Sequence, residues 1–423
     1  MMWLLVLLLV FFLLRIPISI SLGITSLIGL LVSGTDPIIV AQKIVTGVDS
    51  FVLIAIPLFI LAGEIMSVGG ISKRIVDFAV LCVGHLPAGL GMVAVLACML
   101  FAAISGTAIA DAAAIGAILI PAMIAQGYDR RFAPTLVASA STIGAVIPPS
   151  IPLILFGVMA SVSVGDLFMA GVTPGIAMGI ALMIYVYFYG KRHQIKGRET
   201  RATAKEIIVG FKDAFLPLLL PVIIIGGFRL GIFTATEAGV VAVVYGLIIS
   251  IFVYRELPLK EFPRILLNSA LSSASILFVI ANATLFTWVL AFNGVPGQLG
   301  KLILSISEET WVLLLLINIT LLVVGAFIDL ISALTIFTPL FLPLVLQAGV
   351  DPIHFGIIMV VNLSIGMIVP PVGVCLFVTS AIAKVGLTEM LRPLLPQFLA
   401  LLVVLALVTY WPSFSLWLPN LFK

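Results

Sequence analysis

The chain has 423 residues, of which 62% are hydrophobic and 9% are charged, and its formal net charge is +3. This composition excludes an ordinary soluble domain and indicates a protein that crosses a membrane many times, since one helical span needs ~20 apolar residues. Its three cysteines and three histidines match no disulfide or zinc spacing, and no glycine-rich stretch has the spacing of a phosphate-binding loop. We therefore expect neither a metalloenzyme nor direct use of ATP.

Residues 1–50 are predicted to form the N-terminal part of a membrane scaffold. Their apolar run at 3–33 is interrupted at Arg15 and Pro17, so it could form one kinked span or two short helices. No basic leader precedes the run and no small-residue cleavage site follows it. We therefore expect a retained anchor and not a cleaved signal peptide.

A first repeat is predicted over residues 51–190, with helices broken at polar or proline-containing points. Two apolar pieces, each short for a full span, are hinged at Ser105–Thr107 and predict a re-entrant hairpin. A later span carries Pro148 and Pro149 in its middle, where two amide donors are missing and the helix should unwind. The expected parts, in order, are a scaffold span at 51–68, an amphipathic interfacial arm at 72–87, the hairpin at 89–125, the interrupted span at 132–162 and a span at 173–190.

Residues 191–264 are predicted to form a basic loop and two scaffold spans. The loop, 191–206, is the most soluble-looking stretch, and its Lys and Arg residues place it in the cytoplasm. The two spans are expected at 211–231 and 237–254.

A second repeat then covers 265–423. Its expected parts, in order, are a scaffold span at 265–292, an interfacial arm near 295–308, a hairpin at 310–346, an interrupted span at 354–384 and a final span at 396–418.

The two repeats are related by a constant offset of 222 residues. Identical residues at this offset are Pro121 and Pro343, Gly127 and Gly349, Asp129 and Asp351, Gly144 and Gly366, Pro148 and Pro370, and Pro149 and Pro371. Counting spans from the cytoplasmic loop brings most Lys and Arg residues to that side, and the first hairpin then enters from the cytoplasm and the second from the opposite side. Inverted repeats with broken helices are typical of secondary transporters.

The broken helices predict binding sites for a cation and for an anionic substrate. Free carbonyls at half-helix ends suit a cation, whereas free amides at half-helix starts suit an anion. We therefore expect one sodium site in each repeat, with a substrate cavity between them. The first sodium site would use Ser105, Gly106, Thr107, Gly144, Val146, Ile147 and Pro148. The second would use Gly325, Asp329, Thr335, Gly366, Met367, Val369 and Pro370. The substrate cavity would use Ser105, Thr107, Asp111, Ser150, Asp329 and Ser332.

Structural alternatives exist for each of these residue types. Small and hydroxyl-bearing residues in membrane helices often serve only packing and helix contact. Ionisable residues within spans are costly, so Asp111 and Asp329 could be cation ligands, proton carriers or caps of nearby amides. Glu64 and Glu237 lie nearer to span ends, which favours structural pairing with neighbouring basic residues. The polar residues of 268–288 could face the cavity or pack on the scaffold.

The paired motifs resemble those of a known transporter family, the large membrane subunit of tripartite ATP-independent periplasmic (TRAP) transporters of the DctM and SiaM type. The resemblance rests on SGTAIADAAAIGAILIPAM with STIGAVIPPSIPLILFG, repeated as GAFIDLISALTIFTPLFLPL with IGMIVPPVGVCLF, and extends over essentially the whole chain. It implies an all-α, elevator-type fold of the ion-transporter superfamily, in which the hairpins and interrupted spans form a mobile transport domain. It also places the sodium sites on the residues named above. Ser105 and Thr107 correspond to Phe327 and Asp329, which favours backbone ligation in the second site.

For function, the resemblance implies sodium-coupled uptake of an organic acid, such as a sialic acid or a C4-dicarboxylate, with a lean towards sialic acid. The implied partners are a small four-helix membrane subunit and a periplasmic binding protein that delivers substrate. We expect a multi-pass protein of the bacterial inner membrane that is not an enzyme, has no cofactor beyond sodium as coupling ion and binds no nucleic acid. The alternative is an anion exporter or proton-coupled antiporter of the same superfamily that works without a binding protein.

Overall fold

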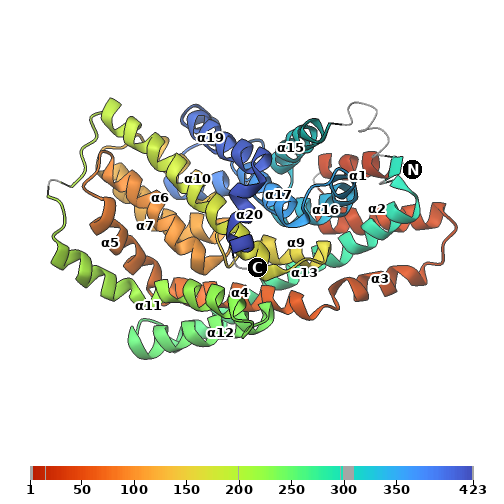
Figure 1. Cartoon of the computed structure of the whole chain (residues 1–423), viewed down its shortest axis with the longest axis horizontal. Helices are drawn as coiled ribbons and strands as arrows, with labels where there is room; N and C mark the ends of the chain where they lie inside the picture. The colour runs from red at the N-terminus through yellow and green to blue at the C-terminus, as the bar shows by residue number, and fades with distance from the viewer. Residues whose placement is uncertain (1–2, 15, 199, 296, 299–308, 422–423) are drawn as a thin grey trace.

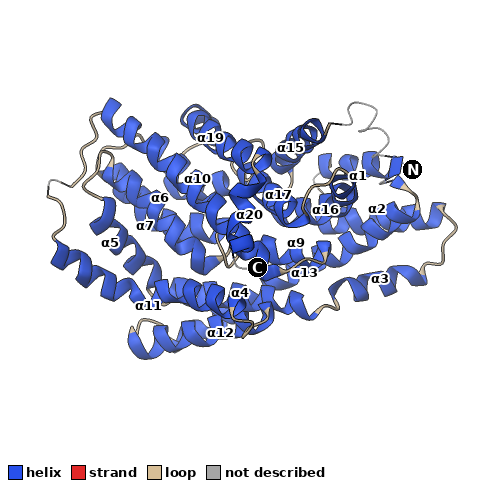
Figure 2. Ribbon diagram, in the orientation of Figure 1, coloured by secondary structure: helices blue, strands red, loops and turns tan. Residues whose placement is uncertain are grey.

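A computed structural model describes residues 3–14, 16–198, 200–295, 297–298 and 309–421. Over these residues every regular element is a helix, and Figure 2 shows helices joined by loops with no strand between them. Nine of the described helices are long and apolar enough to cross a membrane. The all-α polytopic membrane fold predicted from the sequence is therefore confirmed.

The first fifty residues contain three short helices. They are α1 (Trp3–Leu13), α2 (Ile18–Val32) and α3 (Ile38–Val48). The apolar run at 3–33 thus forms two helices, with Pro17 in an extended conformation at the start of α2. Both α2 and α3 pack against α13 (Phe262–Phe292), so the N-terminal helices lie beside the first helix of the second repeat (Figure 1).

The first repeat contains two broken elements in the expected order. Its helices are η1 (Phe51–Ile54), α4 (Ala55–Val68), α5 (Ile71–Val83), α6 (Gly89–Ser105), α7 (Ala108–Ala125), α8 (Phe132–Ser141), η2 (Thr142–Ala145), α9 (Ile151–Ala160) and α10 (Val164–Arg192). The last of these starts earlier than the span expected at 173–190. The reason is an N-cap, because the hydroxyl of Ser163 accepts a hydrogen bond from the amide of Asp166 at 3.2 Å.

Two further helices connect the repeats. They are α11 (Ala204–Arg229) and α12 (Ala235–Ile248), which continues into η3 (Ile249–Val253) and is followed by the short η4 (Leu259–Glu261). Each of the two long helices starts with a capping box, in which a Thr side chain and a Glu side chain bond each other's backbone amides. Glu237 belongs to the second box, with Thr234 as its partner, so its role is structural.

The second repeat has the same order of broken elements as the first. Its helices are α13, α15 (Thr310–Phe327), α16 (Leu330–Gln347), α17 (Pro352–Gly366), α18 (Val374–Ala383), α19 (Leu387–Tyr410) and α20 (Pro412–Leu421). The interfacial arm expected near 295–308 falls largely outside the described residues. The single final span expected at 396–418 is divided between α19 and α20, because Pro412 cannot continue the hydrogen bonding of α19.

The two repeats interlock at the centre of the molecule. Helix α18 of the second repeat packs against α7 and α8 of the first, and α16 packs against α9. Figure 1 shows the α6–α7 hairpin and the α15–α16 hairpin on opposite sides of this centre. The long α10 packs on α6, α9, α17, α19 and α20, whereas α11 and α12 pack mainly on α5 and α4. The broken helices and α10 therefore pack on one another, while α6 and α16 also pack on α5 and α13.

Candidate ion and substrate site

The tip of the first hairpin is a tight turn between α6 and α7. Gly106 ends α6 with a φ of +66°, a left-handed conformation that glycine adopts without strain. Thr107 then caps α7, since its Oγ1 accepts a hydrogen bond from the amide of Ala110 at 3.2 Å. A Cβ atom at Gly106 would lie 2.6 Å from the carbonyl oxygen of Pro149, so the tip is in direct contact with the broken span.

The first broken span consists of α8, η2 and α9, with a cis Pro148–Pro149 peptide bond between its two halves. Ser150 is fully buried and caps α9, because its hydroxyl accepts a hydrogen bond from the amide of Leu153 at 3.2 Å. The amide of Ile151 donates to the carbonyl oxygen of Gly106 at 3.3 Å. The start of α9 is therefore bonded directly to the hairpin tip.

Asp111 lies on α7, one turn beyond the tip, with an exposed fraction of 0%. Its Oδ1 accepts a hydrogen bond from the hydroxyl of Ser105, while Oδ2 is buried without a partner among the described residues. A Cβ atom at Gly144 would collide with Oδ2 and would lie 3.0 Å from the carbonyl oxygen of Thr107. A carboxylate, a hydroxyl and a carbonyl therefore converge where α7 faces η2.

This oxygen cluster is suited to a small cation. A buried carboxylate without a counter-charge is costly, and carboxylate, hydroxyl and carbonyl oxygens are the ligands that hard cations prefer. The structure thus brings Asp111, expected to line the substrate cavity, together with the residues expected to form the first sodium site. Val146 lies against α10 instead, since a Cβ atom at Gly171 would be 2.5 Å from its carbonyl oxygen. The side chain of Ile147 likewise contacts α10 at Gly175.

The tip of the second hairpin uses a carboxylate as a helix cap. Oδ1 of Asp329 accepts a hydrogen bond from the amide of Ser332 at 3.1 Å, and Oδ2 accepts one from the hydroxyl of the same residue at 2.5 Å. The amide of Val372 donates to the carbonyl oxygen of Ala326 at 3.0 Å, so this tip too is bonded to its broken span. Asp329 was considered as a cation ligand, a proton carrier or a helix cap, and its hydrogen bonds are those of a helix cap.

The second hairpin and its broken span meet at two glycines. A Cβ atom at Gly366 would lie 2.7 Å from the Cα of Gly325, so neither position has room for a side chain. Beyond Gly366 the chain unwinds through Met367 and Val369, and the amide of Val369 donates to the carbonyl oxygen of Gly366 at 2.9 Å. A cis Pro370–Pro371 bond follows. This backbone is the counterpart of η2 and Pro148–Pro149 in the first repeat.

The two repeats differ in their side-chain oxygens. At the 222-residue offset, Asp111 corresponds to Ala333, so the second repeat lacks a carboxylate at this position. Asp329 is only partly buried, and both of its oxygens have partners. Thr335, expected in the second sodium site, donates its hydroxyl to the carbonyl of Ile331 in its own helix at 2.6 Å. The second tip therefore offers backbone carbonyls and the Thr335 hydroxyl oxygen, whose lone pairs stay free, but no counterpart of the Asp111 carboxylate.

A buried polar network behind the second tip was not anticipated. Asn362 donates to Oδ1 of Asn318 at 2.7 Å, and Nδ2 of Asn318 donates to Thr409 at 2.9 Å, which joins α15, α17 and α19. The sequence does show polar residues within apolar spans. It does not show which of them pair, because the partners are 44 and 91 residues apart. In α13, Asn282 contacts Gly23 of α2, so the polar face of that span packs on the N-terminal helices at this point.

The fold is similar to that of a solved transporter. A crystal structure of the YdaH transporter of Alcanivorax borkumensis, described as having an unusual topology, matches with a TM-score of 0.60. The match covers 89% of this chain and 87% of that one, at 15% sequence identity. At this level of identity the similarity concerns the fold alone.

Several curated relatives are similar in sequence over nearly the whole chain. The C4-dicarboxylate TRAP transporter large permease protein DctM of Rhodobacter capsulatus is 41% identical over 96% of this chain and 95% of its own length. The sialic acid TRAP transporter large permease protein SiaM of Vibrio cholerae is 39% identical, also over 96% of this chain and 95% of its own length. The isethionate TRAP transporter permease protein DctMQ of Oleidesulfovibrio alaskensis is 42% identical over 95% of this chain, but over 64% of that longer protein.

The sequence model of one protein family matches residues 5–414 of the chain. That family is described as the DctM component of the tripartite ATP-independent periplasmic transporter. The matched range includes both hairpins, both broken spans and the oxygen cluster around Asp111. The chain therefore belongs to the DctM component family of TRAP transporters, and it is a transporter subunit and not an enzyme.

Proposed function

We propose that this subunit carries an organic acid into the cell, driven by sodium ions. The relatives named for C4-dicarboxylates, sialic acid and isethionate all handle anions, which supports an anionic substrate. Their identities to this chain are alike, so the lean towards sialic acid gains no weight from them. The substrate class proposed is a small organic anion of the C4-dicarboxylate or sialic-acid type.

Coupling to sodium is supported above all by the oxygen cluster at the first hairpin. Asp111 offers a carboxylate oxygen that has no hydrogen-bond partner among the described residues, at a point lined by Ser105 and the Thr107 carbonyl. A sodium ion there would neutralise the buried charge and would bind hairpin and broken span to each other. In the second repeat the proposed ligands are backbone carbonyls around Gly366 and Val369. Asp329 stabilises the turn at the hairpin tip by capping α16.

The proposed substrate cavity lies between the two tips. Thr107 and Ser150 cap the helices α7 and α9, and Ser332 lies in the first turn of α16, so the three hydroxyl groups mark three helix starts. Amides at helix starts carry partial positive charge and suit a carboxylate. A bound organic acid would thus be held mainly by main-chain dipoles, with sodium ions supplying the nearby positive charge.

Movement of the broken helices as one body is the proposed transport step. The interlocking of α18 with α7 and α8, and of α16 with α9, supports a single rigid unit that carries both sites. In this elevator mechanism the unit slides past the scaffold made by α4, α5, α11, α12 and α13.

The proposed partners are a small membrane subunit and a periplasmic binding protein. The DctMQ relative is longer than this chain, and its name joins two components, which supports a second membrane component beside the large one. The word periplasmic in the family description supports substrate delivery from that compartment and a location in the bacterial inner membrane.

The test is reconstituted uptake. The full chain, with its small subunit, would be placed in proteoliposomes and offered radiolabelled succinate or N-acetylneuraminate, with and without a sodium gradient and the binding protein. We expect uptake of one acid that requires both the gradient and the binding protein. Uptake driven equally well by a proton gradient in sodium-free buffer would overturn the sodium assignment, and uptake without any binding protein would favour the antiporter alternative.

A further inference from the structure

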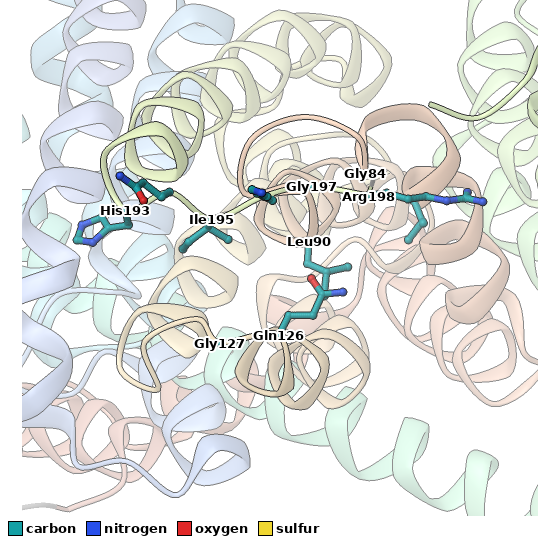
Figure 3. Close-up of a pocket in the computed structure, with 11 residues that line it drawn as sticks. Gly84, Leu90, Gln126, Gly127, His193, Ile195, Gly197 and Arg198 are labelled. Carbon is teal, nitrogen blue, oxygen red and sulfur yellow. The ribbon is translucent and has the colours of Figure 1, made fainter. Parts of the chain in front are cut away.

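A cavity of about 610 Å³ lies at the end of the first hairpin opposite to its tip. Its walls come from the end of α5, the start of α6, the turn between α7 and α8, and residues 193–198, which we call the strap. Figure 3 shows the strap running across the cavity from His193 to Arg198, with Gln126 and Leu90 on the facing wall. The strap is the first part of the connection from α10 to α11.

Backbone contacts hold the strap in place. The amide of Arg198 donates to the carbonyl oxygen of Gly84 at 2.8 Å, and the amide of Ala88 donates to that of Ile195 at 2.9 Å. Gly197 lies so close to the α5–α6 turn that a Cβ atom there would be 2.7 Å from the carbonyl oxygen of Gly84. The cavity is therefore a built feature of the fold.

The cavity has a positive rim. Lys196 and Arg198 contribute cationic side chains, and His193, Gln194 and Gln126 add polar groups. Among the residues that the structure describes, none that lines the cavity is a carboxylate. The rim is thus suited to an anion.

Carboxylates near the strap, among those the structure describes, already have partners. Asp129, in the α7–α8 turn, accepts hydrogen bonds from the amide of Arg131 at 2.8 Å and from its guanidinium at 3.1 Å. Glu206, in the first turn of α11, accepts a hydrogen bond from the amide of Thr203 at 2.7 Å. Glu206 also attracts Arg198 electrostatically. No ion pair among the described residues joins Lys196 or Arg198 to a carboxylate, so both side chains can still bind an anionic ligand.

The cavity also has apolar lining residues. Val80, Leu90 and Ile195 line it, so a ligand with both an anionic and an apolar part would be matched. The strap belongs to the basic loop expected on the cytoplasmic side, at the level where spans end and lipid headgroups begin. Basic pockets between helices on that side bind phosphate-containing headgroups, because Lys and Arg form charge-assisted hydrogen bonds with phosphate.

We propose that this cavity binds a phosphate group, carried by an anionic phospholipid of the cytoplasmic leaflet, with Lys196 and Arg198 as its cationic partners. The apolar lining residues favour the lipid over free phosphate, because only the lipid has an apolar part. The bound headgroup would connect the interfacial helix α5, the base of the first hairpin and the strap. This inference is independent of the transported substrate and of the coupling ion.

The test compares two double variants of the full chain, purified in neutral detergent. Lys196→Gln with Arg198→Gln removes the charges of the cavity rim, whereas Arg201→Gln with Lys205→Gln removes two charges from the same connection outside the cavity lining. Each protein is titrated with phosphatidylglycerol, phosphatidylcholine or inorganic phosphate. Bound lipid is measured by native mass spectrometry, and stability is measured by the midpoint of thermal unfolding.

We expect phosphatidylglycerol to bind and stabilise the unmodified chain and the control variant. The rim variant should bind it roughly 30-fold more weakly, since each basic residue contributes about 1 kcal/mol to binding an anionic headgroup. A different outcome is that inorganic phosphate stabilises the unmodified chain as strongly as phosphatidylglycerol does, and loses this effect in the rim variant to the same extent. That result would support the phosphate site and assign it to the soluble ion. Equal binding of phosphatidylglycerol by both double variants, or equal binding of phosphatidylcholine and phosphatidylglycerol, would overturn the proposal.

Discussion

Asp111 and Asp329 are the same residue type near the two hairpin tips, yet their surroundings give them different roles. Asp111 is enclosed, with one oxygen bonded to Ser105 and the other without a protein partner among the described residues. Asp329 is partly exposed, and Ser332 occupies both of its oxygens. We therefore infer that the first repeat contributes more to ion dependence than the second.

Replacement of Asp111 by Asn tests this difference, since Asp111→Asn removes the charge and keeps the shape. We expect the sodium concentration for half-maximal uptake to rise roughly tenfold or more, because losing a charged partner costs about 1.5–3 kcal/mol. Initial uptake rates in proteoliposomes, measured against sodium concentration, provide the readout. Asp213→Asn, on the exposed surface of α11, is the control and should leave the curve unchanged. A normal sodium response in Asp111→Asn would exclude the carboxylate from the site.

Gly106 and Gly127 form a matched pair for testing the first tip. Both have positive φ angles, of +66° and +87°, so alanine costs about 1–2 kcal/mol of backbone strain at either position. Only at Gly106 would the new Cβ also meet another atom, the Pro149 carbonyl oxygen at 2.6 Å. We expect Gly106→Ala to lower the thermal unfolding midpoint further than Gly127→Ala and to reduce uptake as well. Equal effects of the two would show that the close contact at the tip is dispensable.

At the scale of elements, helix breaks were predictable wherever Gly and Pro interrupt apolar runs. The two hairpins and the two interrupted helices are confirmed, with α6 ending at Ser105 and α17 at Gly366. The early start of α10, at Val164, was not predicted, because it depends on the hydroxyl of Ser163 as an N-cap. The network around Asn362 was missed because its partners lie far away in the sequence. Thr335 was expected at a site from its residue type, and only the structure shows its hydroxyl bonded within its own helix. The assignment of ligands to each sodium site stays a prediction.

The contact between α15 and α17 depends on the absence of side chains. Gly366→Ala would place a Cβ atom 2.7 Å from the Cα of Gly325, and backbone atoms cannot move aside as a flexible side chain can. We expect a loss of about 1–3 kcal/mol in unfolding free energy, as for other overpacked contacts, together with reduced uptake. Gly226→Ala, inside α11 with open space around it, should instead be neutral or stabilising by up to about 1 kcal/mol. A stable and fully active Gly366→Ala protein would mean that the second hairpin tolerates displacement from its broken span.

At the scale of the whole molecule, the broken helices of the two repeats pack against each other. Because α18 packs on α7 and α8, and α16 packs on α9, a displacement of one hairpin must carry the other repeat with it. In the proposed elevator mechanism, the broken helices and α10 would move against the helices assigned above to the scaffold. Along α10 and α11 the boundary between these two groups includes the edge-to-face pair of Phe168 and Phe228, whose ring centroids are 5.4 Å apart.

A disulfide across this boundary tests whether the unit moves. A Cβ atom at Gly165 in α10 would lie 3.6 Å from the Cβ of Phe228 in α11, which is within the range of ~3.5–4.5 Å found in disulfides. We therefore expect Gly165→Cys with Phe228→Cys, in a background with Cys82→Ser, to form a crosslink under mild oxidation. If α10 travels with the broken helices, the crosslink should stop uptake, and a reductant should restore it.

Two comparisons separate a lock on movement from damage to the fold. Each single-cysteine variant, oxidised in the same way, should keep its activity, because no partner thiol lies across the boundary. The crosslinked protein should also still bind sodium, measured as a rise in the thermal unfolding midpoint with sodium chloride over an equal concentration of choline chloride. A crosslinked protein that transports at the rate of the reduced one would show that α10 and α11 do not separate during the cycle, and the moving unit would then have to exclude α10.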